Sequence, residues 1–116
     1  MIRSKYGSKK TIYKEIKFDS LAERDYYILL EGMLSRKEIM NIELQPKVYL
    51  TKAKILYKPD FLITDSDNKK YYIDVKGFKT PVFNIKARLW KAYIEDELHI
   101  IKKKGRGFIT EKIING

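Results

Sequence analysis

Residues 58–76 read KPDFLITDSDNKKYYIDVK and are the most informative stretch of the sequence. Two apolar runs flank a short polar segment, a pattern that predicts a β-hairpin. If the hairpin is symmetric about its turn, Asp60 lies opposite Asp74 and Phe61 lies opposite Ile73. Directly opposed side chains have Cβ atoms about 4.5–5.5 Å apart, so the two carboxylates repel unless a cation lies between them. A one-residue bulge would change this register, which is therefore a hypothesis.

Lys76 adds a basic group to this acidic face, because it lies two residues beyond Asp74 and strand side chains alternate. Its ammonium can hold or polarise a metal-bound water, or neutralise charge that builds on a phosphorus in the transition state. The chain has no Cys and one His, so metal chemistry must use carboxylates, which favours Mg²⁺ or Mn²⁺. The pattern predicts a carboxylate metal site on the hairpin.

The segments outside the hairpin alternate between helical and strand patterns. The expected helices span about 21–36 and 81–94, and the expected strands span about 39–45, 48–50 (a bent edge that continues the preceding strand), 54–57, 97–101 and 108–114, with a turn over 102–107. This order predicts an α/β domain with a mixed central β-sheet and flanking helices. One domain is expected over residues 1–116, with residues 1–10 as a basic, mobile N-terminal arm.

Each helix has an expected buried side and an expected first residue. Glu23 lies on the apolar stripe of the first helix, where a carboxylate is costly unless it is paired or bound to metal. It also lies three residues after Ser20, so a helix capping box is the alternative role, and the two roles are compatible. In the second helix, Thr80 and Pro81 form the start. Its expected buried side chains are Phe83, Leu89, Trp90 and Tyr93.

The charge of the chain points to a polyanionic partner. Its 25 Lys and Arg residues exceed its 15 Asp and Glu residues, which gives a net charge of +10. Residues 1–17 carry a net +5 and residues 101–116 a net +4, so the excess lies at the two ends. No run approaches the ~18 apolar residues of a membrane span, and no secretion signal is expected. The expected compartment is the cytoplasm, or the host cytoplasm for a phage protein.

Basic residues at the ends and on the second helix are expected to contact nucleic-acid phosphates. The alternative is that they form solvated surfaces that aid solubility. The residues are Arg3, Lys5, Lys9, Lys10, Lys86, Arg88, Lys91, Lys102, Lys103, Lys104 and Arg106.

Pro59-Asp60, followed after thirteen residues by Asp74-Val75-Lys76, resembles the signature of the PD-(D/E)xK nuclease superfamily. The flanks are similar to those of a small phage and prophage nuclease family, akin to phage endonuclease I and other Holliday-junction resolvases. These flanks are residues 5–11, 16–20 with Glu23, 44–47 and 74–78. The resemblance covers about residues 5–101 and implies a restriction-endonuclease-like core.

The resemblance also implies roles for individual residues. Glu23, Asp60 and Asp74 would be acidic metal ligands, Val75 would add its backbone carbonyl, and Lys76 would be the catalytic lysine. The family often has Glu where this chain has Asp74. Gln45 and Pro46 match a Gln-Pro pair in the family, without an assigned role. The implied cofactor is Mg²⁺, with Mn²⁺ as a substitute.

The expected function is that of a metal-dependent, structure-selective DNA endonuclease, specifically a phage Holliday-junction resolvase. Symmetric cleavage of a two-fold junction needs two active sites, so a homodimer is expected. One alternative is a non-catalytic nucleic-acid-binding module with basic arms. The other is a nicking or packaging-associated endonuclease with a different DNA substrate.

Overall fold

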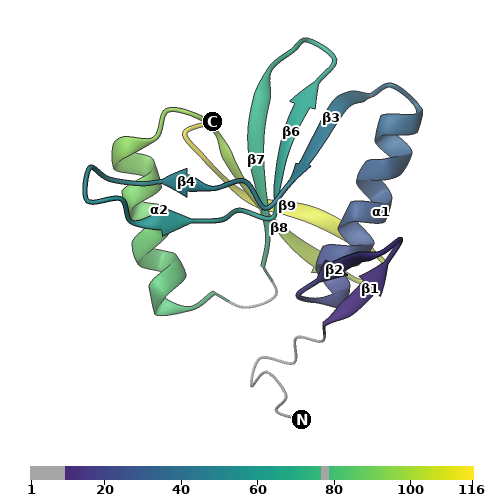
Figure 1. Cartoon of the computed structure of the whole chain (residues 1–116), viewed down its shortest axis with the longest axis horizontal. Helices are drawn as coiled ribbons and strands as arrows, with labels where there is room; N and C mark the ends of the chain where they lie inside the picture. Colours follow the sequence, from purple (N-terminus) through teal and green to yellow (C-terminus); the bar gives the residue numbers. More distant parts are fainter. Residues whose placement is uncertain (1–9, 77–78) are drawn as a thin grey trace.

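The computed structural model describes residues 10–76 and 79–116 and shows a mixed α/β arrangement (Figure 1). The helices are α1 (Leu21–Ser35) and α2 (Pro81–Tyr93). The strands are β1 (Thr11–Tyr13), β2 (Ile16–Phe18), β3 (Ile39–Leu44), β4 (Val48–Tyr49), β5 (Leu56–Tyr57), β6 (Phe61–Asp65), β7 (Lys70–Val75), β8 (Leu98–Lys104) and β9 (Gly107–Ile114). No helix in the described ranges is both long enough and apolar enough to cross a bilayer.

The central sheet has the strand order β3-β6-β7-β8-β9. Only β7 and β8 are parallel, and the other neighbouring pairs are antiparallel. The β6–β7 hairpin has the predicted register, with Phe61 paired to Ile73 and Leu62 to Tyr72. The Asp65 carboxylate stabilises its turn by accepting backbone N–H bonds from Asp67 and Lys69, each at 2.9 Å. The expected mixed central sheet is therefore confirmed.

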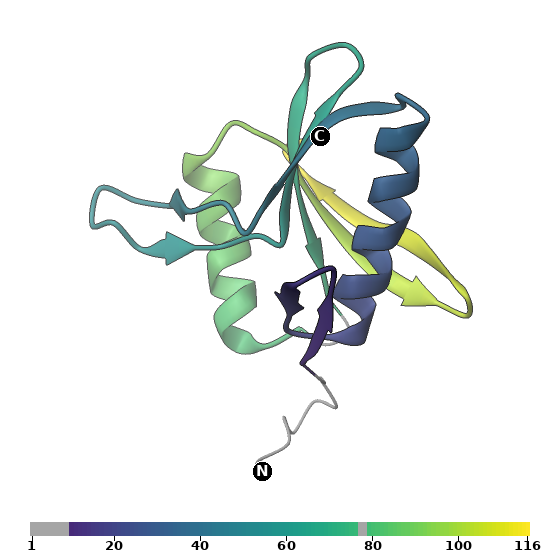
Figure 2. The same cartoon turned by 45° about the vertical axis from the view of Figure 1, so that its right-hand side comes forward.

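The two helices cover opposite faces of this sheet (Figures 1 and 2). Successive strand residues point to opposite faces, so the sheet supplies one side of two separate cores. Ile73 and Val75 pack on the α1 side with Phe61, whereas Ile100 packs on the α2 side with Trp90. Both faces are apolar because both are covered.

The two helices begin as the sequence predicts. The Ser20 side chain accepts the backbone N–H of Glu23 at 3.0 Å and starts α1. The Thr80 side chain accepts the backbone N–H of Phe83 at 3.1 Å, with Pro81 in the first turn of α2. The expectation that Tyr93 is buried is wrong, because its side chain lies at the end of α2 and is 65% exposed.

Three β segments differ from the expectation. Residues 11–18 form the β1–β2 hairpin, whose turn residues Lys14 and Glu15 both have positive φ. Val48–Tyr49 pairs with Leu56–Tyr57 in a separate two-stranded sheet and does not continue β3. Residues 102–104 belong to β8, so the turn comprises only the loop between Lys104 and Gly107. The pairing of β9 along β8 extends the strand, which the lysine run alone does not indicate.

Candidate functional site

The candidate site lies at the edge of the sheet where β7 and β8 have their carboxyl ends. Asp74 pairs in register with Ile100, and the Lys76 N–H donates to the Ile101 carbonyl at 2.8 Å. Asp60 immediately precedes β6, which runs antiparallel to β7, so its side chain reaches the same edge. The N-terminal turn of α1 adds Glu23. The fold therefore brings together all three predicted acidic residues.

Asp60 occupies the centre of this cluster. Its Oδ2 accepts the backbone N–H of Val75 at 2.7 Å, which ties the start of β6 to the end of β7. Burial, together with the charges and hydrogen bonds of Asp74 and Glu23, raises the pKa of Asp60 well above its usual range. This carboxyl therefore tends to keep a proton in the absence of a cation.

Asp74 is buried, with 2% of its surface exposed, on the α2 side of the sheet. The Tyr57 hydroxyl donates a hydrogen bond to Oδ2, and the Lys76 Nζ lies 3.3 Å from Oδ1. Burial and the neighbouring Asp74 charge raise the pKa of Tyr57, so its hydroxyl stays protonated as a donor. Tyr57 is a site residue that the sequence pattern missed, because its 17-residue separation from Asp74 is bridged only by tertiary packing.

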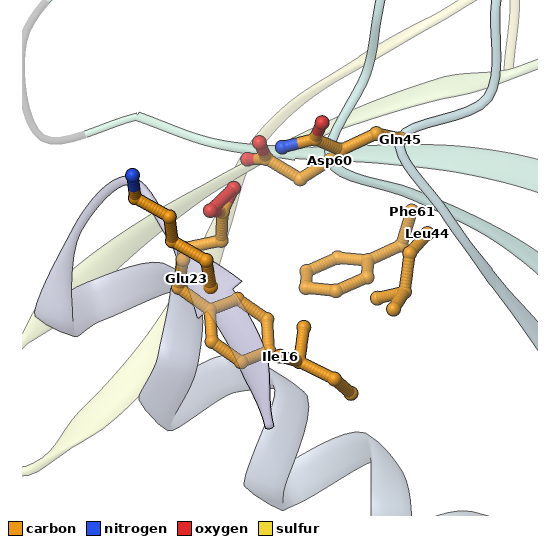
Figure 3. Close-up of a pocket in the computed structure, with 8 residues that line it drawn as sticks. Ile16, Glu23, Leu44, Gln45, Asp60 and Phe61 are labelled. Carbon is orange, nitrogen blue, oxygen red and sulfur yellow. The ribbon is translucent and has the colours of Figure 1, made fainter. Parts of the chain in front are cut away.

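Glu23 is also buried, with 3% of its surface exposed, and faces Asp60 from α1. Its Oε2 accepts the backbone N–H of Asp19 at 3.1 Å, while its own N–H donates to Ser20. This is the capping arrangement expected from the sequence, shifted by one residue. In Figure 3 the Glu23 and Asp60 carboxylates point toward one another. Capping and the carboxylate cluster therefore use the same side chain.

A pocket of about 170 Å³ separates α1 and β2 from the start of β6, and it is lined by Glu23, Gln45, Asp60 and apolar side chains among others (Figure 3). Gln45 has a φ of 46°, and its backbone N–H donates to the Asp60 carbonyl at 2.9 Å. Its side-chain amide lies beside the Asp60 carboxylate in Figure 3. The Gln45-Pro46 pair was the only sequence signal for this placement.

The cluster does not form a closed metal cage. Within residues 10–76 and 79–116, no group of three or more His, Cys, Asp or Glu side chains is arranged to hold a metal ion. Each carboxylate instead accepts a bond from the protein: Glu23 from Asp19, Asp60 from Val75, and Asp74 from Tyr57. The donor set still suits a hard divalent cation, because three neighbouring carboxylates supply oxygen ligands and mutual repulsion that a cation would relieve. The Val75 carbonyl stays a predicted ligand.

The predicted phosphate-contacting residues lie in several places. Lys86 lines a hollow beside Lys76, and Arg88 and Lys91 are exposed on α2. Lys102–Lys104 lie on β8 beyond the end of β7, with Lys103 paired to Asp25 at 3.1 Å, and Arg106 is in the following turn. Lys10 is exposed before β1. Arg3, Lys5 and Lys9, with most of the expected arm, fall outside the described residues.

The fold and the cluster define a mixed α/β protein with three carboxylates and a lysine gathered at one sheet edge. The chain belongs to the family described as "Protein of unknown function (DUF1064)", which matches residues 3–106. A search of curated proteins found no match. The match spans every residue of the cluster.

Proposed function

We propose that the protein is a metal-dependent DNA endonuclease with a restriction-endonuclease-like core. The observation that carries this proposal is the position of Asp60, whose carboxyl is acted on by both Asp74 and Glu23 and has a strongly raised pKa. Such a cluster destabilises the fold by mutual repulsion, which is most simply understood if a divalent cation is its partner. The sequence resemblance to PD-(D/E)xK nucleases supports the same function.

Each residue of the carboxylate cluster, and each group bonded to it, has a role in the proposed reaction. Glu23, Asp60 and Asp74 would hold Mg²⁺ or Mn²⁺, and the bound ion would lower the pKa of water enough for phosphodiester hydrolysis near neutral pH. Lys76 Nζ lies 3.3 Å from Asp74 Oδ1 and offers a positive charge and hydrogen-bond donors to a reacting phosphate. Tyr57 and the Val75 N–H fix the orientation of Asp74 and Asp60.

The substrate assignment rests on the resemblance to Holliday-junction resolvases. A four-way junction has two strands to cut symmetrically, so a homodimer with one cluster per subunit fits this substrate. The net charge of +10 supports a nucleic-acid partner of either linear or branched form. A non-catalytic binding module is disfavoured, because carboxylates on a phosphate-binding surface weaken binding unless a cation offsets them.

The test compares an end-labelled four-way junction, a fork, a nicked duplex and a linear duplex, each with Mg²⁺ or with EDTA. We expect Mg²⁺-dependent, paired cuts in the junction and little cutting of the linear duplex. Cutting of the fork alone would indicate a different branched substrate for the same chemistry, and cutting of the nicked duplex alone would indicate an unbranched one. Tight, salt-sensitive binding without cleavage of any substrate would replace the nuclease proposal with the binding module.

A further inference from the structure

A second hollow lies on the α2 side of the carboxylate cluster and is separate from the pocket in Figure 3. It has a volume of about 380 Å³ and is lined by residues that include Tyr57, Lys58, Lys76, Phe83 and Lys86. Three of its lining residues are lysines, and no lining residue is acidic. We call it the lysine hollow.

Two aromatic rings hold lysine ammonium groups in the lysine hollow. Lys76 Nζ lies 4.6 Å from the centroid of the Phe83 ring, and Lys86 Nζ lies 5.9 Å from that of the Tyr57 ring. The two rings are 6.3 Å apart, so the two cations are held near one another. Cation–π attraction offsets part of the repulsion between these ammonium groups.

The positive charge of the lysine hollow is incompletely compensated. Lys76 is beside Asp74, but neither Lys58 nor Lys86 forms an ion pair among the described residues. A concave site with a cationic lining concentrates a positive potential, which attracts anions. Thr80 at the start of α2 also lines the hollow, so the positive end of the helix dipole adds to this potential.

The segment that leads into the lysine hollow is basic as well. Residues 47–58 contain four lysines and no acidic residue, and they include the β4–β5 hairpin. In both views this hairpin runs across α2 and its turn projects beyond the helix (Figures 1 and 2). A polyanion longer than a single phosphate therefore finds further positive charge beyond the hollow.

We propose that the lysine hollow binds an internal phosphate of the nucleic-acid backbone, next to the phosphate that is cut. Lys58 and Lys86 are its ligands, and Lys76 lies between this phosphate and the carboxylate cluster. The inference rests on the proposed nuclease function and adds the path of the nucleic-acid strand. This path runs from the carboxylate cluster across the lysine hollow toward β4–β5. A single bound nucleotide would leave the lysines of the hairpin without a partner.

The test measures binding, in EDTA, of a fluorescent four-way junction with 5′-hydroxyl ends over a series of salt concentrations. Lys58→Gln, Lys86→Gln and the double variant are compared with Lys70→Gln, which removes an exposed lysine at the opposite end of β7. We expect the double variant to bind about tenfold more weakly, with the slope of log K against log salt reduced by about one. Lys86→Arg keeps the positive charge and should bind as tightly as the parent protein. Lys70→Gln should also bind as the parent does.

Wild-type affinity and salt slope in the double variant would overturn the proposal. The same junction with 5′-phosphate ends is measured in parallel. If the double variant loses affinity only for this phosphorylated junction, the proposal is also overturned, because the hollow would then hold a terminal phosphate. Lys58 is exposed, so Lys58→Gln reports on the site without disturbing the core. Because these measurements use EDTA, they stand apart from cleavage: a parent protein that binds through the hollow but never cuts would contradict only the proposed function.

Discussion

The backbone N–H of Val75 donates to the Asp60 carboxylate across 2.7 Å, and this bond joins the two halves of the Pro-Asp and Asp-x-Lys pattern. It fixes Asp60 beside Asp74 at the point where the β6–β7 pairing ends. The bond satisfies one oxygen of a carboxyl that repels its neighbours. The carboxylate cluster is therefore built into the sheet and does not depend on a flexible loop.

Asp60→Asn should stabilise the protein in metal-free buffer at neutral pH. Asn keeps an oxygen that accepts the Val75 N–H but removes the charge that Asp74 and Glu23 oppose. We expect a gain on the order of 1 kcal/mol, or about 4 °C in Tm, by thermal unfolding in EDTA. Asp67→Asn in the turn of the same hairpin is the control, and it should leave Tm unchanged.

The stabilisation by Asp60→Asn should depend on pH in a defined direction. The folded-state pKa of Asp60 is raised, so wild-type stability falls as pH rises from about 4 through that raised value. The advantage of the variant is greatest above this window and should vanish below about pH 4. A constant difference across the pH series, or a variant less stable than the parent at neutral pH, would contradict the repulsion.

Divalent metal should make the parent protein more stable than Asp60→Asn, which reverses the order expected in metal-free buffer. Mg²⁺ binding to the folded state raises stability by about 2.7 kcal/mol at a hundredfold excess over Kd. We expect a Tm increase with Mg²⁺ for the parent and a much smaller one for Asp60→Asn, with titration calorimetry as the direct check. An equal Mg²⁺ response in both proteins would place the binding site elsewhere.

Substitutions at Glu23 and Ser20 should separate helix capping from chemistry. Glu23→Gln keeps an oxygen for the Asp19 N–H but loses the charge, so Tm should be unchanged or raised while cleavage falls at least about 100-fold. Ser20→Ala should lose about 1 kcal/mol of stability and retain cleavage. Paired unfolding and cleavage assays check both. Normal cleavage by Glu23→Gln would leave Glu23 with a capping role alone.

Tyr57→Phe should lower both stability and activity. The substitution keeps the ring that packs against Phe83 and Trp90 but removes the donor to buried Asp74. We expect a cost of about 1–3 kcal/mol and a 10- to 100-fold loss in cleavage rate. Tyr71→Phe, at a ring stacked on His99 in the same sheet, is the control and should retain cleavage. Unaltered cleavage by Tyr57→Phe would show that the hydroxyl does not position Asp74.

The features that follow local rules could be predicted from the sequence. The alternation over 58–76 gave the register of Phe61 with Ile73, and the spacing of Ser20 and Glu23 gave the start of α1. These succeed because side-chain period and capping chemistry act over a few residues. The proximity of Asp60 and Asp74 follows from the register alone.

The features that depend on distant packing or unusual turns could not be predicted. The β1–β2 turn is formed by Lys14 and Glu15 with φ values of 49° and 67°, and neither residue is the Asn or Gly that marks such turns. From the sequence alone, Tyr57 is indistinguishable from an ordinary core aromatic residue, because its role depends on the packing of β4–β5 beside α2. The sequence predicts a turn at Lys102–Lys104, because a run of lysines does not indicate that these residues pair with β9.

The most direct test of the carboxylate cluster as a nuclease centre is the single-turnover rate of junction cleavage in Mg²⁺ by Asp74→Asn and Asp67→Asn. Both variants remove one charge from the same hairpin, but only Asp74 belongs to the cluster. We predict that Asp74→Asn loses at least about 100-fold in rate and that Asp67→Asn cuts at the parent rate. Equal rates for the two variants would contradict the assignment of this cluster as the centre of the reaction.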